Sequence, residues 1–464
     1  MRRADPRWQL EVVGRPESGG NTMRLANHLW DRFGGLALDD IPAEARTVAG
    51  QCALDWFGCA LAGSREPLSG ILRDELGGQA GPCSIVGTGL NCPPGVAALV
   101  NGAASHALDF DDTHSMMGGH PTVPVFPAAL AQAQEMGASG ERLLVAFVVG
   151  VEVESRVGAL IGGAAYRKGW HSTSTIGVHG AAAAACHLMG ARNEQFAHAL
   201  GLAASQASGL KANFGTMTKP FHAGHAAERG LLSARLAMRG FTSNPEAVDG
   251  RQGYADAAAA GHEAVNWQRL KEQDGRFLIE DTLFKYHAAC YLTHAAIESV
   301  GRLRPQLAAA GVSAGDVEKA IVTVHPGLLD ICGIPEPRTG LEAKFSLVAT
   351  TSLAMLGIDT TDTGTFVDET LDDPEVARMI DRVEVRTDRG LGHTQARVEL
   401  RANGHSLEEF HDTGIPATDL EAQGAKLAAK MTGLTVPLLG AEASDRLREL
   451  SLGLEAVGDV RELC

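Results

Sequence analysis

The segment 101–127 concentrates residues whose types and spacing could do chemistry. It reads NGAASHALDFDDTHSMMGGHPTVPVFP and places three carboxylates, Asp109, Asp111 and Asp112, within four residues, with His120 close behind. Carboxylates this close raise one another's pKa, so they need a cation, a ligand or a hydrogen-bond network to compensate. Taken alone, the segment is better interpreted as a capped helix end before a Gly-rich loop. The recurrence of similar polar loops further along the chain favours a functional site.

Two later segments carry further polar candidates. GWHSTSTIG places His171 directly before four hydroxyl residues that are good helix N-caps, and FGTMTKPFHAGH places Lys219 at a loop-to-helix junction. Because a helix N-terminus attracts anions, we expect a substrate carboxylate beside His171. His222 and His225 lie three residues apart on one helix face, but this spacing is too common to indicate a metal pair.

Composition limits the classes of partner. The formal net charge is −16, from 40 basic and 56 acidic residues, which argues against nucleic acid and anionic membranes as partners. An anionic substrate would therefore need a local cationic pocket. The eight cysteines form no CxxC pair, so neither a zinc ribbon nor an iron–sulfur cluster is indicated, and we predict no metal and no cofactor. We recognise no signal peptide or membrane-spanning run and expect a cytoplasmic protein.

The elements that must position these residues fall into two groups. The chain of 464 residues is too long to fold around a single hydrophobic core of ordinary size, which predicts two domains. We interpret residues 1–22 as a disordered extension. Helical periodicity with many small residues runs from residue 23, whereas alternating patterns and an Asn403-Gly404 hairpin signal appear after residue 275. We predict a mainly α protein in which a large all-helical domain, 23–268 and 414–464, is interrupted by an α/β domain, 269–413, with an antiparallel sheet.

Three motifs in the same order, ALDFDDTH…GHP, GWHSTSTIG and FGTMTKPFHAGHAA, resemble the MmgE/PrpD family. The resemblance runs from about residue 25 to the last residue and is densest from 101 to 253. It implies a similar two-domain fold, a homodimer and a cofactor-independent enzyme acting on a small polycarboxylate. Family activities include 2-methylcitrate dehydratase, cis-aconitate decarboxylase and iminodisuccinate epimerase.

The resemblance also implies roles for individual residues. The family's active-site residues fall here on four catalytic and three substrate-binding positions, to which we add the lysine of PRTGLEAKFS, a segment close to the epimerase pattern. The catalytic candidates are Asp109, His120, His171 and Lys219, and the substrate-binding candidates are Thr113, Lys285, Cys290 and Lys344. Two positions depart from cis-aconitate decarboxylase, because its histidine falls on Cys290 and its tyrosine falls near Ile331 or Cys332.

Elimination from a polycarboxylate, or its epimerisation, needs cations for the carboxylates, a base for the acidic carbon-bound proton and an acid. The two lysines Lys219 and Lys285 suit the first role, and histidines near neutral pKa suit the others. A 2-methylcitrate dehydratase-like lyase is our leading hypothesis, and an iminodisuccinate-type epimerase is the alternative. Cis-aconitate decarboxylase and a non-catalytic helical binding protein rank lower.

Overall fold

The computed structural model describes residues 25–464 except 162, 260 and 262–264. The predicted disordered extension, 1–22, therefore lies outside the described residues. Among the described helices, none is both long and apolar enough to cross a bilayer.

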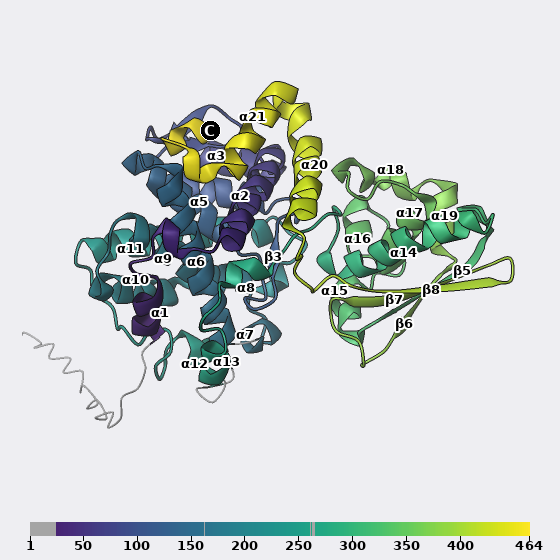
Figure 1. Cartoon of the computed structure of the whole chain (residues 1–464), viewed down its shortest axis with the longest axis horizontal. Coiled ribbons are helices and arrows are strands. Elements are labelled where there is room, and N and C mark those ends of the chain that lie inside the picture. The colour runs from purple at the N-terminus through teal and green to yellow at the C-terminus, as the bar shows by residue number, and fades with distance from the viewer. Residues whose placement is uncertain (1–24, 162, 260, 262–264) are drawn as a thin grey trace, which may run out of the picture.

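Tightly packed helices form the larger part of the molecule (Figure 1). Small residues set their spacing: a Cβ added at Gly224 would come within 2.0 Å of the Leu99 carbonyl oxygen, and one at Gly230 within 2.6 Å of that of Val178. The Ala- and Gly-rich composition thus brings backbones into direct contact. The main helices of this part are α1 (Leu25–Phe33), α2 (Ala43–Gly63), α3 (Pro67–Leu76), α4 (Pro94–Ser105), α5 (Thr122–Met136), α6 (Gly140–Ile161), α7 (Ala164–Arg167), α8 (Ser172–Thr175), α9 (Gly177–Leu188), α10 (Asn193–Gln206), α11 (Thr218–Met238), α12 (Tyr254–Ala258), α13 (Trp267–Lys271), α20 (Leu420–Leu439) and α21 (Ala441–Leu452).

The smaller part is a four-stranded sheet in the order β6-β5-β7-β8, with helices packed on it. Its strands β7 and β8 form the predicted hairpin, and the turn residues Asn403 and Gly404 have φ values of 49° and 77°, as a type I′ turn requires. The elements are α14 (Tyr291–Ala309), β5 (Val317–Val324), α15 (Leu329–Cys332), α16 (Gly340–Lys344), α17 (Leu347–Leu356), α18 (Asp368–Leu371), α19 (Pro374–Ile380), β6 (Val383–Thr387), β7 (Gln395–Ala402) and β8 (His405–Asp412).

The predicted mainly α fold with a smaller sheet is confirmed, with one refinement of the sheet. Strands β5, β7 and β8 pair antiparallel, as expected, but β6 pairs parallel to β5, so the sheet is mixed. The long connection between β5 and β6, which contains α15 to α19, permits this parallel pairing because it is far longer than a hairpin turn.

The last helices return to the helical part, where α20 packs along α2. Lys430 of α20 lies 2.5 Å from Asp55 of α2, and both side chains are buried. Its ammonium also donates to the Phe110 carbonyl oxygen at 2.6 Å, which fixes the loop that carries the acidic cluster. Our division of the chain into two domains at 268–269 and 413–414 remains a proposal.

Candidate active site

A short strand pair joins the acidic loop to the segment that carries Lys285. Strand β3 (Thr113–His114) pairs antiparallel with β4 (Thr282–Leu283), and Lys285 follows two residues after β4. The loop after β3 closes on itself, because the Thr113 hydroxyl donates to the Gly119 carbonyl oxygen at 3.1 Å. Residues more than 160 positions apart are thereby fixed side by side.

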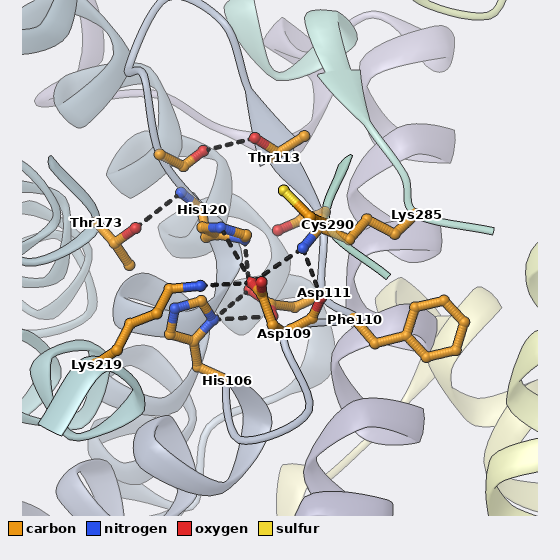
Figure 2. A network of polar contacts seen from close by, with 12 residues as sticks. His106, Asp109, Phe110, Asp111, Thr113, His120, Thr173, Lys219, Lys285 and Cys290 are labelled. Atoms are coloured by element: carbon orange, nitrogen blue, oxygen red, sulfur yellow. Dashed lines mark hydrogen bonds and ion pairs between the residues drawn. The ribbon is translucent and has the colours of Figure 1, made fainter. Parts of the chain in front are cut away.

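Asp109 is the centre of the polar network (Figure 2). Its Oδ1 lies 2.7 Å from the Lys219 ammonium and 3.0 Å from that of Lys285, which also donates to the Asp109 carbonyl oxygen at 2.5 Å. Burial by itself raises the pKa of Asp109, but the two lysines outweigh it and hold that pKa well below its ordinary value. Asp109 also has a φ of 51°, in the left-handed region that non-glycine residues rarely adopt. Strain of this kind often marks functional sites.

Asp111 lies between two histidines, behind the pocket wall. The Nδ1 of His106 is 2.9 and 3.0 Å from its two carboxylate oxygens, and the Nδ1 of His120 is 2.9 Å from Oδ2. His120 also reaches toward Asp109, with Nε2 3.7 Å from Oδ1. Burial lowers the pKa of His106 to about 4 despite the opposing effect of Asp111. The trio thus supplies a carboxylate-oriented histidine, His120, facing the pocket.

His171 is a buried, neutral histidine. The ring of His106 lies between the rings of His120 and His171. The ring of His171 stacks on His106 at 5.9 Å between centroids, and its Nδ1 lies 3.1 Å from that of His222. Burial lowers the pKa of His171 well below its ordinary value, and the nearby His106 and Lys219 act in the same direction. A neutral imidazole is the form that can accept a proton.

The hydroxyl residues that follow His171 form a short helix of their own. The helix α8 is a single turn, and its Thr173 Oγ1 accepts from the His120 backbone N–H at 3.1 Å. The expected binding of a substrate carboxylate beside His171 remains a prediction. Thr173 fixes the backbone of the loop that carries His120.

One cavity, with a volume of about 210 Å³, is lined by Asp109, His120, His171, Lys219 and Lys285. Residues from both the helical part and the smaller part of the molecule form its wall. Larger cavities of about 620 and 630 Å³ lie elsewhere, beside Lys426 and between α2 and the C-terminal end. We favour the smaller cavity because convergent charges and perturbed pKa values gather there. Its lining residues are Asp109, Thr113, Gly118, Gly119, His120, Tyr166, His171, Thr173, Phe214, Lys219, Lys285, Cys290, Tyr291, Leu292, Ile331 and Phe345.

Seven of the eight candidates from the sequence line this cavity, and Lys344 does not. The ammonium of Lys344 lies 5.8 Å from the centroid of the Phe366 ring. The three clustered carboxylates also separate, because Asp112 points away from the cavity and accepts from the backbone N–H of Thr122 at 3.3 Å. Burial raises the pKa of Asp112 to about 8, with the nearby Asp55 adding to the effect. Only Asp109 of the cluster reaches the cavity wall.

Sequence reasoning missed His106, Tyr166, Phe214 and the contact of His222 with His171. The spacing of His106 and Asp111, five residues apart around a helix end, was a usable signal because His106 directly precedes the ALDFDDTH segment that contains Asp111. Tyr166 and Phe214 carry no comparable signal, since single aromatic residues outside a recognisable motif are common.

Four residues of the site, His106, Asp109, Asp111 and His120, offer possible metal-ligand atoms within 4.8 Å of one another. Two ammoniums already contact the Asp109 oxygen, and a third cation at that oxygen would be repelled by both. The donor set therefore fits a divalent cation poorly, and the absence of a catalytic metal remains our prediction.

Comparison with known proteins defines the class of this chain. The MmgE/PrpD N-terminal domain matches residues 28–266, and the MmgE/PrpD C-terminal domain matches residues 287–456. The chain belongs to the MmgE/PrpD family, which confirms the resemblance seen in the three motifs.

Individual relatives in the family carry two different activities in their names. The chain is 32% identical over 304 residues to human cis-aconitate decarboxylase, covering 64% of this chain and 62% of that protein. It is 30% identical over 285 residues to the Aspergillus terreus cis-aconitate decarboxylase, covering 58% of each. It is 28% identical over 312 residues to 2-methylcitrate dehydratase of Escherichia coli K12, covering 62% of each. The matches thus span about three fifths of the length of these curated relatives.

Proposed function

We propose that this protein is a cofactor-independent lyase that removes a proton α to a carboxylate of a small polycarboxylate, with 2-methylcitrate dehydratase-like elimination of water as the leading reaction. One observation carries the proposal: a carboxylate held between two ammoniums lies in the same cavity as two histidines with different partners. In a chain of net charge −16, such a cationic cavity is where an anionic substrate would bind.

The lysines suit the binding of substrate carboxylates and the stabilisation of the charge that develops when the α-proton leaves. Lys285 is buried, and although burial lowers its pKa, Asp109 and Asp111 raise it above the ordinary value, so this lysine stays charged. Lys219, at the start of α11, presents the second ammonium. Asp109 fixes both ammoniums and leaves N–H groups free for substrate oxygens.

The two histidines suit opposite proton-transfer roles. We assign His171 as the base, because it is neutral and lines the cavity. We assign His120 as the acid that protonates the leaving hydroxyl, because Asp111, 2.9 Å from its Nδ1, orients the ring in the wall of the cavity. Thr113 closes the loop that carries His120 and faces the same cavity.

An epimerase is the second candidate, because epimerisation begins with the same proton abstraction and differs only in reprotonation. The segment PRTGLEAKFS resembles iminodisuccinate epimerase and favours this alternative. Decarboxylation of cis-aconitate ranks below both, because by resemblance the histidine of that enzyme falls here on Cys290 and its tyrosine falls near Ile331 or Cys332.

Proton NMR in heavy water on the purified protein tests the proposal. We expect 2-methylcitrate or citrate to lose water and give an alkene with deuterium exchange at the α-carbon. Exchange without alkene, on an aminodicarboxylate, would assign the epimerase instead. No exchange, elimination or decarboxylation across these substrates and cis-aconitate would refute the function. A homodimer is a further proposal, tested by light scattering at micromolar concentration.

A further inference from the structure

Two cysteine side chains meet at the wall of the candidate active site. The Cys332 thiol donates to the Cys290 sulfur, with the two Sγ atoms 3.3 Å apart. Cys290 lines the cavity, whereas Cys332 at the end of α15 is fully buried behind it. A small reagent that enters the cavity would therefore react with Cys290 first. Cys332 is close enough to react next with the modified Cys290 sulfur.

The Cys290 sulfur is placed to react first, because it lines the cavity whereas Cys332 lies behind it. The hydrogen bond from Cys332 lowers the pKa of Cys290, and Lys285 acts in the same direction, while burial and Asp109 oppose them. The same hydrogen bond and burial raise the pKa of Cys332 well above its ordinary value. Cys290 is therefore the attacking cysteine by its position and Cys332 the resolving one, and the two pKa directions agree with these roles because a thiolate is the nucleophile in thiol oxidation.

We propose that Cys290 and Cys332 form an oxidisable dithiol that takes a small hydroperoxide from the active-site cavity and closes to a disulfide, switching the site off. With hydrogen peroxide, the Cys290 thiolate attacks one peroxide oxygen, breaks the O–O bond and becomes a sulfenic acid, while the second oxygen leaves as hydroxide. The Cys332 thiol then attacks the Cys290 sulfur, forms the S–S bond and releases water. The two thiols are oxidised by two electrons, and one peroxide is consumed.

The geometry requires only a small movement. A disulfide has an S–S distance of about 2.05 Å, so the sulfurs must approach by roughly 1.2 Å from their separation of 3.3 Å. Cys290 precedes the first residue of α14, and its backbone N–H donates to the Lys344 carbonyl oxygen at 2.9 Å. Closure would draw the end of α15 and the neighbouring Ile331 toward α14, and both Ile331 and Cys290 belong to the cavity wall.

A second cysteine pair in the fold provides an internal control. Cys83 and Cys92 face each other across the hairpin of β1 (Cys83–Ile85) and β2 (Leu90–Cys92). The Cys83 thiol donates to the Ala131 carbonyl oxygen, and burial raises the pKa of Cys83 to about 12 and that of Cys92 to about 11. This pair should therefore remain reduced when Cys290 reacts.

Peptide mass mapping after treatment with hydrogen peroxide decides the proposal without reference to the reaction catalysed. We expect a linked peptide that joins Cys290 to Cys332, a loss of turnover in the assay above, and recovery of both by dithiothreitol. With Cys332→Ser, peroxide should convert Cys290 to a sulfinic acid that dithiothreitol does not reduce, so the loss becomes irreversible. Cys83→Ser should behave as the unmodified protein.

Three results would overturn the dithiol: no Cys290–Cys332 link, a link only between Cys83 and Cys92, or reversible inactivation that persists with Cys332→Ser. The turnover readout rests on the proposed function, whereas the peptide map does not. Phenylarsine oxide, which bridges adjacent thiols, gives an independent check that needs no oxidation. It should bind the unmodified protein in one-to-one ratio and bind neither Cys290→Ser nor Cys332→Ser, and binding retained by both variants would count against the pair.

Discussion

Replacing Asp109 by asparagine should separate catalysis from substrate binding. Asparagine keeps the shape of the side chain and tolerates the left-handed φ of 51°, so the loop should remain intact. The change removes the charge that fixes the ammoniums of Lys219 and Lys285 at 2.7 and 3.0 Å. The two ammoniums still attract a polycarboxylate, but they no longer hold it at the position where the histidines can transfer protons to and from it.

We expect kcat of Asp109→Asn to fall by about 10²–10⁴-fold, the range of a lost acid–base arrangement, while KM stays equal or decreases. This loss corresponds to about 2.7–5.4 kcal/mol of transition-state stabilisation. Steady-state kinetics on the substrate found by NMR measure both parameters. The matched control is Asp112→Asn, in the same segment but directed away from the cavity at Thr122. Because burial raises the pKa of Asp112 to about 8, its neutral replacement should leave kcat unchanged.

The assignment of Asp109 would be refuted if Asp109→Asn kept kcat within about threefold of the unmodified value, since such a loss is below the range expected for acid–base groups. An increase in KM with constant kcat would equally contradict it, because that result marks loss of uniform binding. An equal loss in Asp112→Asn would show damage to the loop rather than to the chemistry.

Four further predictions address the remaining groups. Lys219→Met should raise KM about 10-fold or more, since one fully engaged ion pair contributes a few kcal/mol; Lys426→Met, which removes the same charge from a larger cavity, should leave KM unchanged. His171→Asn should lower kcat by about 10²–10⁴-fold and abolish α-proton exchange in heavy water, while His179→Asn, one turn into α9, should retain turnover. Burial lowers the pKa of His179 to about 4 from 6.5, so its contribution to stability is present above pH 6.5 and is lost as pH falls toward 4; unfolding titrations of His179→Asn should show a pH dependence shallower by up to about 3 kcal/mol. Incubation with EDTA should leave turnover unchanged.

Each of these measurements can contradict its prediction. A KM change in Lys426→Met comparable to that of Lys219→Met would favour the larger cavity as the substrate site. Exchange that persists in His171→Asn would move the base to His120 or to another group. Parallel pH curves for the two proteins would show that His179 titrates normally in the folded state. Activity lost with EDTA and restored by iron, zinc or magnesium would reverse our metal prediction.

Much of the architecture could be predicted from local sequence signals. The small-residue helices, the hairpin at Asn403-Gly404 and the mainly α fold follow from periodicity and turn chemistry, which act over a few residues. Seven of the eight site candidates gather in one cavity, yet they were chosen through family resemblance, because spacing alone left their convergence open. The parallel pairing of β6 with β5 was not predictable, since it depends on how 58 residues between Val324 and Val383 fold back.

The sequence by itself determined which residue types this site contains and that a strongly acidic chain needs a cationic pocket for an anionic ligand. Only the tertiary structure decided which of the neighbouring carboxylates faces that pocket. Asp109 turns to Lys219 and Lys285, Asp111 to His106 and His120, and Asp112 to Thr122. The left-handed backbone at Asp109 and the distant helices packed on each side set these directions, and neither leaves a trace in local spacing. The same packing brought Cys290 against Cys332, 42 residues later, because α14 and α15 meet at the cavity wall.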